Sequence, residues 1–322
     1  MTSSSDAPRV PRHQRQFHQR WNFLHDPHVR TLAWLLDAPD LLDACAAEWQ
    51  GKIASIDPVD GEVQEWLGEL DRAPQALRDH LGLQPFTRLG RYAEKLMAFY
   101  LAHREQLFAH GLQVRGGKNE TIGEFDFLLR KGDGLVHWEF ATKLYLLESS
   151  GHGHQADYFV GPNLADTLGA KVRKIMGQQL TLSTHPFAKI HLPHPVVAAQ
   201  ALVKGWLFYH GATPAPVQPL GISRAHCRGF WCSLTEVQAF EAPYYALLPR
   251  LNWLAPAKVP SEQGISKDAL VERLATHFAG SSTPALVALL EPDGDWLLEC
   301  DRGFVVPNDW RVRAEMRIKR IE

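Results

Sequence analysis

Hydrophobic side chains recur every three or four positions along the first part of the chain, a spacing typical of helices. From Trp21 onward the apolar positions predict a helix, and further helix is expected at 40–50 and 62–80. Residues 18–85 therefore form a helical N-terminal region in this interpretation. Residues 1–17 before it are rich in Ser, Arg and Gln and lack this pattern, so we expect them to be disordered.

The same spacing predicts longer helices further along the chain. Residues 88–109 carry apolar side chains on one helix face, and Gly111 can end that helix. Residues 163–180 and 266–279 predict two more helices of the same amphipathic kind. Since each has one apolar face, each is expected to pack that face against the rest of the protein.

Strands are predicted where apolar and polar residues alternate. Residues 122–130 and 135–147 alternate in this way, and they flank the turn sequence Lys131-Gly132-Asp133-Gly134, which favours a hairpin. With the short segment 112–116 in front, they form a three-strand meander. The apolar run 199–209 predicts a buried fourth strand.

The predicted elements place the protein in the α/β class and divide it into regions. Helix, three-strand meander, helix and strand follow one another within residues 86–210. Residues 211–322 form a mixed α/β C-terminal region with a hairpin-like pair of strands at 284–306. At 322 residues the chain buries enough surface to fold without a metal or a disulfide.

Composition and charge exclude several classes of protein. The formal net charge of −2 excludes a uniformly basic nucleic-acid-binding coat, although a local basic groove stays compatible with it. No apolar stretch is long enough to span a membrane, so we expect no membrane partner. The four cysteines form no CxxC pair and no apolar signal core opens the chain, so we expect reduced thiols and a cytoplasmic location. The closest histidine pairs lack zinc-finger spacing.

Polar side chains of the two hairpin strands are expected on one face of the sheet, because successive strand residues point to opposite faces. Glu124 and Asp126 share that face on the first strand, and Glu139 and Lys143 share it on the second. With the two-residue loop at Gly132–Asp133, Asp126 lies directly across from Glu139. With the loop one residue later, Glu124 lies across from Lys143. In both registers three carboxylates converge.

Carboxylates this close repel one another and raise one another's pKa, and a divalent cation removes the repulsion. Mg²⁺ is typically held by one or two carboxylates, and it can activate water and neutralise charge on a phosphate. Glu94 lies among apolar residues of the 88–109 helix, where an acid needs a partner, so it could join the site. The alternative is an ordinary solvated strand face with cross-strand ion pairs.

The helix at 163–180 carries a polar stripe that could follow a phosphate backbone. A solvated helix face is the alternative. The residues of the stripe are Asn163, Thr167, Lys171, Lys174 and Gln178.

The sequence Gly123-Glu124-Phe125-Asp126, with Glu139 thirteen residues after Asp126, resembles the motifs of the PD-(D/E)XK, or restriction-endonuclease-like, nucleases. The resemblance implies a restriction-endonuclease-like core of helix, three-strand meander, helix and strand. It also implies that Asp126 and Glu139 bind a metal ion and that Glu94 assists from the first core helix. The chain as a whole also resembles a bacterial family that carries an unknown-function label.

One position departs from the nuclease pattern. The motif lysine belongs at position 141, where this chain has Ala141, and Lys143 follows two residues later on the same strand face. Migration of the lysine occurs in this superfamily, and so does loss of catalysis.

We therefore expect Mg²⁺- or Mn²⁺-dependent hydrolysis of DNA phosphodiester bonds. Asp126 and Glu139 would bind the metal with help from Glu94 or Glu124, and Lys143 would be the catalytic lysine. The stripe residues Lys171, Lys174 and Gln178 would contact phosphates. The alternatives are an inactive protein of the same fold that binds nucleic acid or acts as an adaptor, and a structural protein whose polar strand face is only solvated.

Overall fold

The computed structural model describes residues 13–84, 86–117, 120–148, 155–211 and 220–320 of the chain. Its α-helices are, in chain order, α1 (His13–Trp21), α2 (Pro27–Asp37), α3 (Gly61–Arg72), α4 (Gln75–Leu81), α5 (Leu89–His103), α6 (Leu168–Lys174), α7 (Pro186–His191), α8 (Lys267–Gly280) and α9 (Trp310–Ile318). The strands are β1 (Leu107–Gly117), β2 (Glu120–Lys131), β3 (Gly134–Leu147), β4 (Phe159–Val160), β5 (Val196–Tyr209), β6 (Cys227–Ser233), β7 (Tyr244–Leu247), β8 (Lys258–Pro260), β9 (Ala285–Asp293) and β10 (Trp296–Val306).

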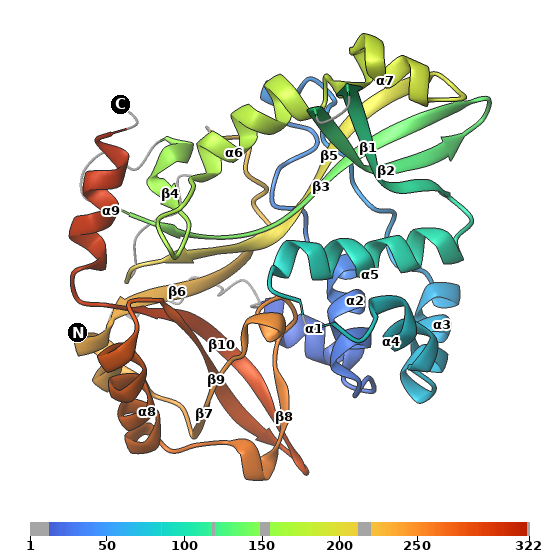
Figure 1. Cartoon of the computed structure of the whole chain (residues 1–322). Coiled ribbons are helices and arrows are strands. Elements are labelled where there is room, and N and C mark those ends of the chain that lie inside the picture. The colour runs from blue at the N-terminus through green and yellow to red at the C-terminus, as the bar shows by residue number, and fades with distance from the viewer. Residues whose placement is uncertain (1–12, 85, 118–119, 149–154, 212–219, 321–322) are drawn as a thin grey trace, which may run out of the picture.

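One mixed sheet of ten strands runs through the described part of the protein (Figure 1). Its strand order is β1-β2-β3-β5-β6-β10-β9-β7, with β4 paired to β3 and β8 paired to β10. β1, β2 and β3 form the expected antiparallel meander, and β5 joins β3 in parallel. The α/β class is confirmed. None of the described helices is both long and apolar enough to cross a membrane.

Helices cover both faces of the sheet around β3 (Figure 1). Phe140 and Leu144 of β3 belong to the core that includes the buried side of α5. Ala141 and Tyr145, which alternate with them, belong to a second core with Leu168 of α6. The strand is therefore buried on both faces, so any charged side chain on its α6 face needs a polar partner.

The predicted helix at 88–109 is too long. α5 ends at His103, and β1 begins at Leu107 and pairs with β2, from Leu107 opposite Leu129 onward. Gly111 does not end the helix but lies within β1, in the left-handed region at φ +64. The helical spacing that included Leu107 was misleading because pairing with β2 overrides the local preference of this segment.

The predicted helix at 163–180 is also modified at both ends. α6 begins after Thr167, whose Oγ1 accepts a hydrogen bond of 3.1 Å from the N–H of Ala170. Asn163 therefore lies in the preceding loop and not on the helix. After Lys174 the chain continues as a π-helical turn over Ile175–Gln179, which inserts one extra residue into the helical repeat.

The N-terminal region differs from expectation at two places. Residues 13–17 are helical rather than disordered, because Phe17 is buried in the main core; residues 1–12 lie outside the described part of the chain. The only helical turn within residues 40–50 is the 3₁₀ turn Ala47–Trp49, because Leu41 and the segment that follows Trp49 bond to β5, Leu41 by donating its N–H to the Val203 carbonyl at 2.8 Å. The N–H of Ala54 donates to the carbonyl of Ala201 in β5 at 2.9 Å.

Several elements are confirmed close to their predicted bounds. β2, β3 and β5 cover the predicted strands, and α3 with α4 covers the predicted helix at 62–80, broken at Ala73–Pro74. In the C-terminal region, α8 matches the predicted helix at 266–279 to within one residue at each end. β9 and β10 form the expected hairpin and complete the sheet beside β6.

Candidate active site

The hairpin register places Asp126 beside Glu139. Phe127 pairs with Trp138 and Lys131 with Gly134, so the two-residue loop is Gly132–Asp133 and the alternative register is excluded. The ladder between the strands stops at Phe127, and the Asp126 carboxylate takes over by accepting a hydrogen bond of 2.9 Å from the N–H of Phe140. Asp126 therefore lies where β2 and β3 separate.

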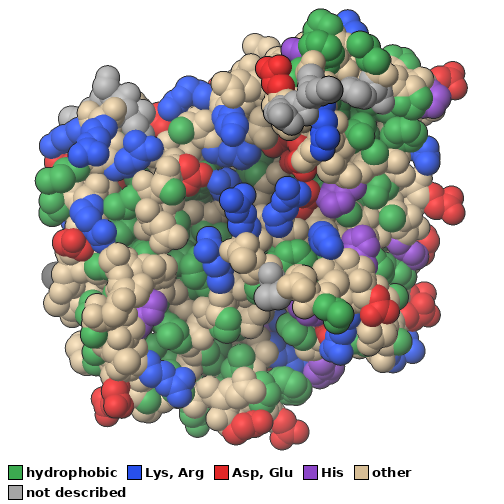
Figure 2. Space-filling view, in the orientation of Figure 1, with side chains coloured by type: hydrophobic (Ala, Val, Ile, Leu, Met, Phe, Trp, Pro, Cys, Tyr) green, Lys and Arg blue, Asp and Glu red, His purple; other side chains and the backbone are tan. Residues whose placement is uncertain are grey.

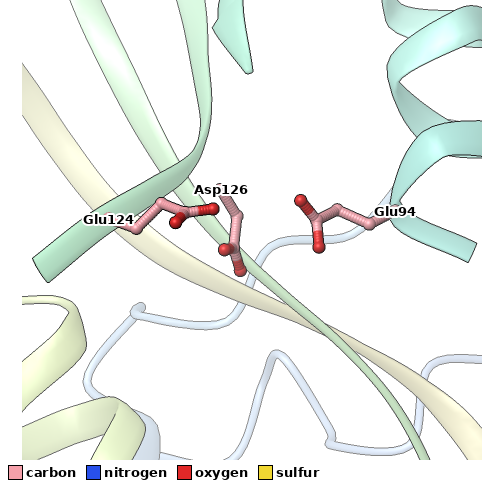
Figure 3. Close-up of side chains that lie close together, drawn as sticks. All are labelled: Glu94, Glu124 and Asp126. Atoms are coloured by element: carbon pink, nitrogen blue, oxygen red, sulfur yellow. The ribbon is translucent and has the colours of Figure 1, made fainter. Parts of the chain in front are cut away.

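Three carboxylates from two elements meet at this point (Figure 3). Glu94 extends from α5, while Glu124 and Asp126 extend from β2, and one oxygen from each lies within 4.8 Å of the others. The sequence-predicted acids are thus brought together. Gly111 of β1 lies beside this cluster, because a Cβ added there would lie 3.5 Å from Glu124 Oε1.

Two basic side chains that the sequence analysis missed contact this acidic cluster. His110 Nε2 lies 2.9 Å from Glu94 Oε1, and Arg91 NH1 lies 3.6 Å from Glu94 and 3.4 Å from Glu124. His110 lies just beyond the predicted helix at 88–109, whereas the structure places it within β1, so the sequence did not indicate its approach to Glu94. Arg91 lies three residues before Glu94, and its spacing alone could have indicated the pair.

Glu139 is the most buried of the acids, with only 2% of its surface exposed. Gln179 donates a hydrogen bond to its Oε1 atom, and Lys171 Nζ lies 3.6 Å from the same atom. Lys171 also donates to Gln179 Oε1 at 3.0 Å. Lys171 and Gln179 therefore both hold the Glu139 carboxylate, from the side of the sheet that α6 covers.

Burial and mutual repulsion change the acidity of this group. Burial, with the Asp126 carboxyl next to it, raises the pKa of Glu139 well above its usual range. Burial also raises the pKa of Asp126, with Glu94 adding to the effect. Burial lowers the pKa of Lys171. The two neighbouring carboxyls therefore both bind a proton more readily than an isolated carboxyl does, Glu139 more so than Asp126.

The donor set fits a divalent cation. Glu139 Oε2 is buried and has no hydrogen-bond partner among the described residues. A hard cation such as Mg²⁺ or Mn²⁺ takes oxygen ligands of this kind and would replace the proton that Glu139 binds. Asp126 and Glu139 would hold it, with Glu94 and Glu124 close by.

Lys143 lies in a different place from the one expected. Its Nζ atom contacts Asp166 Oδ2 at 2.6 Å, and the Tyr145 hydroxyl donates to the same oxygen at 3.2 Å. Lys143 therefore faces the loop before α6, while Lys171 is the lysine that reaches Glu139.

The π-helical turn changes which glutamine faces the site. Lys174 and Gln178 are exposed and contact none of the acids, whereas Gln179 reaches Glu139. The turn contains one residue more than a regular helical turn, so the side chain that faces the site is Gln179 and not Gln178, which the regular spacing predicts. Of the predicted phosphate-contacting residues, Lys171 alone contacts an acid of the site in the described structure.

A cavity of about 430 Å³ opens over these groups. Glu94, Asp126, Glu139 and Lys171 line one part of it. A second part of the wall is built from the start of α5 and from Arg250, which belongs to the short 3₁₀ turn Arg250–Asn252. Figure 2 shows Lys and Arg side chains gathered across the middle of this face, with carboxylates visible in the recess between them.

The chain belongs to the family described as "Domain of unknown function (DUF1853)", which it matches over residues 30–306. No curated protein and no solved structure matches the chain. The matched range contains α5, the meander, α6 and the C-terminal sheet up to the end of β10.

Proposed function

We propose that this protein is a nuclease of the PD-(D/E)XK type that hydrolyses DNA phosphodiester bonds with Mg²⁺ or Mn²⁺. The observation that carries the proposal is the meeting of Glu94, Glu124 and Asp126 at one point, with Glu139 next to Asp126 and a half-buried lysine beside Glu139. Glu94 comes from α5, Asp126 from β2 and Glu139 from β3, and Lys171 lies 3.6 Å from Glu139.

The arrangement of the elements supports the same proposal. A restriction-endonuclease-like core consists of helix, three-strand meander, helix and strand. In this chain α5, β1, β2, β3, α6 and β5 follow in that order, and the strands lie side by side as β1-β2-β3-β5. The two helices cover opposite faces, and the candidate acids lie where the meander opens.

The residues of the chain divide the work as follows. Asp126 and Glu139 would hold the cation with support from Glu94 and Glu124, and the bound cation would supply an activated water molecule and charge neutralisation on the phosphate. Lys171 places a positive charge beside the same point, where it stabilises the charge that develops as the phosphodiester is attacked. Gln179 fixes the carboxylate of Glu139 by donating to it.

The substrate is a polyanion, and the net charge of the protein is −2, so binding depends on the local charge of the cavity. Lys143, Lys171 and Arg250 line this cavity together with the acids. A non-catalytic protein of the same fold that binds nucleic acid is the second candidate. It is favoured by Ala141, which stands where the motif lysine belongs and is buried against α6.

A cleavage assay separates these possibilities. The purified protein is incubated with fluorescently labelled single-stranded, double-stranded and branched DNA in Mn²⁺, in Mg²⁺ and in EDTA. We expect cleavage that requires the metal. Asp126→Asn and Glu139→Gln should each lower the rate at least about 100-fold, because each removes a ligand charge from the site.

The control is Glu272→Gln, which removes one exposed acid of α8 and should leave the rate unchanged. DNA binding without cleavage by the wild-type protein would favour the non-catalytic candidate. Full activity in both site variants would contradict the assignment of the active site, and absence of both binding and cleavage would contradict the function.

A further inference from the structure

Two arginines on the second part of the cavity wall have no carboxylate partner among the described residues. Arg88 precedes α5, and Arg250 belongs to the short turn before Trp253. Both line the cavity and are exposed, and neither forms an ion pair with any residue that the structure describes. Most other buried or cavity-lining cations here are paired, as Lys143 is with Asp166. Unpaired guanidinium groups in a cavity are available for an anion from outside.

The first turn of α5 adds uncapped backbone donors to this wall. Arg88 provides no side-chain cap, and Tyr92 is the first residue whose N–H bonds back, to the Arg88 carbonyl at 3.3 Å. Leu89 and Gly90 line the cavity, and a Cβ added at Gly90 would meet nothing within 4 Å. The positive end of this 15-residue helix therefore opens on free space.

Thr142 is an independent sign of a missing ligand in the same cavity. It lies on β3 and lines the cavity, and only 8% of its surface is exposed. Its Oγ1 atom is buried and has no hydrogen-bond partner among the described residues. A buried hydroxyl without a partner is costly, and an anion in the cavity would supply an acceptor for it.

The segment that follows the Arg250 turn is fixed by hydrogen bonds from a buried arginine. Arg302 of β10 is fully buried and pairs with Glu299 at 2.6 Å. Its guanidinium donates to the carbonyls of Trp253 at 2.6 Å and Ala255 at 2.7 Å. Arg250 therefore projects from a fixed segment of the C-terminal region, and not from a free loop.

We propose that this wall is a second phosphate subsite, formed by Arg88, Arg250, the first N–H groups of α5 and the hydroxyl of Thr142. The inference rests on the proposed nuclease function and gives the C-terminal region a part in binding the substrate. One phosphate of the strand lies at the acidic end of the cavity. The next one lies at this wall, so that the cavity holds the strand at two points.

A binding experiment in EDTA tests the subsite without cleavage. Fluorescence anisotropy follows a fluorescein-labelled single-stranded DNA 12-mer at several KCl concentrations. Arg88→Gln and Arg250→Gln should each weaken binding on the order of fivefold. Each should also reduce the slope of log affinity against log salt by about 0.7, the value for one lost phosphate contact to a single strand.

Two further variants serve as controls. Arg273→Gln removes the same charge from an exposed site on α8 and should change neither the affinity nor the slope. Thr142→Val keeps the shape of the side chain and removes the unpaired hydroxyl. It should weaken DNA binding about threefold while the melting temperature stays the same or rises, whereas a purely structural hydroxyl would lower the melting temperature and leave binding intact.

The origin of the phosphate is settled by repeating the titrations with and without a 5′-phosphate on the DNA. Loss of the Arg250→Gln effect on DNA that lacks it identifies a terminal monoester, and an unchanged effect identifies an internal diester. Wild-type binding with Arg88, Arg250 and Thr142 variants that all match Arg273→Gln would overturn the subsite alone. Absence of wild-type DNA binding and cleavage would overturn the nuclease proposal together with it.

Discussion

At the scale of single residues, two lysines are candidates for the catalytic lysine of the proposed nuclease. Lys171 lies beside the buried Glu139, whereas Lys143 is neutralised by Asp166 at 2.6 Å. A cation acts on the reacting phosphate only if it lies beside the metal ligands. The position of the lysine in three dimensions therefore counts for more than its position in the strand motif.

We predict that Lys171→Ala lowers the DNA cleavage rate about 100-fold or more, as loss of one transition-state donor often does. Lys143→Ala should lower it by less than about tenfold, through weaker substrate binding. Single-turnover rates in Mn²⁺ measure both effects, and Lys174→Ala, the loss of an exposed lysine of α6, is the matched control. A larger loss from Lys143→Ala than from Lys171→Ala would return the catalytic role to the strand.

The acidity of Glu139 predicts a pH-dependent stability. Its pKa is raised in the folded protein by burial and by Asp126. A carboxyl group of this kind favours folding while it is protonated, and this contribution is lost as the pH rises from roughly 4 towards its raised folded pKa. Each pKa unit of elevation corresponds to about 1.4 kcal/mol.

We therefore expect the melting temperature in EDTA to fall as the pH rises from weakly acidic values through neutrality. Glu139→Gln should flatten this fall and raise the melting temperature at the upper end by a few degrees. Mn²⁺ should produce a similar flattening in the wild-type protein by replacing the proton. Thermal unfolding followed by circular dichroism measures each curve. A Glu139→Gln curve parallel to that of Glu272→Gln would contradict the assignment.

The acids could be predicted from sequence, and their partners could not. A period of two and a short turn place Asp126 and Glu139 on one face of the hairpin in either register, and the structure shows which register is formed. Arg91 is the exception, since its spacing from Glu94 on α5 indicates the pair, whereas His110 and Lys171 reach the acids only because β1 and α6 pack around β3. Such contacts depend on the packing angles of elements, which leave no local pattern in the sequence.

At the scale of the secondary-structure element, one irregular turn after α6 determines which glutamine contacts Glu139. The π-helical turn Ile175–Gln179 moves Gln179 onto Glu139 and leaves Gln178 in solvent. A regular helix was assumed in the sequence analysis, because apolar spacing continues through the turn. The extra residue is therefore visible only in the structure. π-Helical turns of this kind are frequent at functional sites.

We predict that Gln179→Ala weakens Mn²⁺ binding about tenfold, the lower end of the effect of removing a residue that orients a metal ligand. Gln178→Ala, the adjacent exposed glutamine, should leave it unchanged. Isothermal titration of the metal-free protein with Mn²⁺ gives both affinities. Equal affinities in the two variants would mean that Gln179 does not position Glu139 for the cation.

The sheet joins the candidate site to the C-terminal region at the scale of the whole molecule. The order of helix, meander, helix and strand was predictable because each element has its own pattern. The pairing of β6 with both β5 and β10 was not, since parallel strands far apart in sequence carry no mark of their partners. The same pairing brings the turn of Arg250 to the cavity and fixes it through Arg302.

The backbone pairing between the N-terminal region and β5 also has a consequence for the timing of folding. The N–H of Ala54 donates to the carbonyl of Ala201, about 150 residues later in the chain, and the N–H of Ala201 donates to the carbonyl of Lys52. At a synthesis rate of roughly 5–20 residues per second, the early segment waits on the order of ten seconds for its partner. During this interval its apolar side chains have no sheet to cover. A nascent chain of this family is thus expected to depend on chaperones until β5 has left the ribosome.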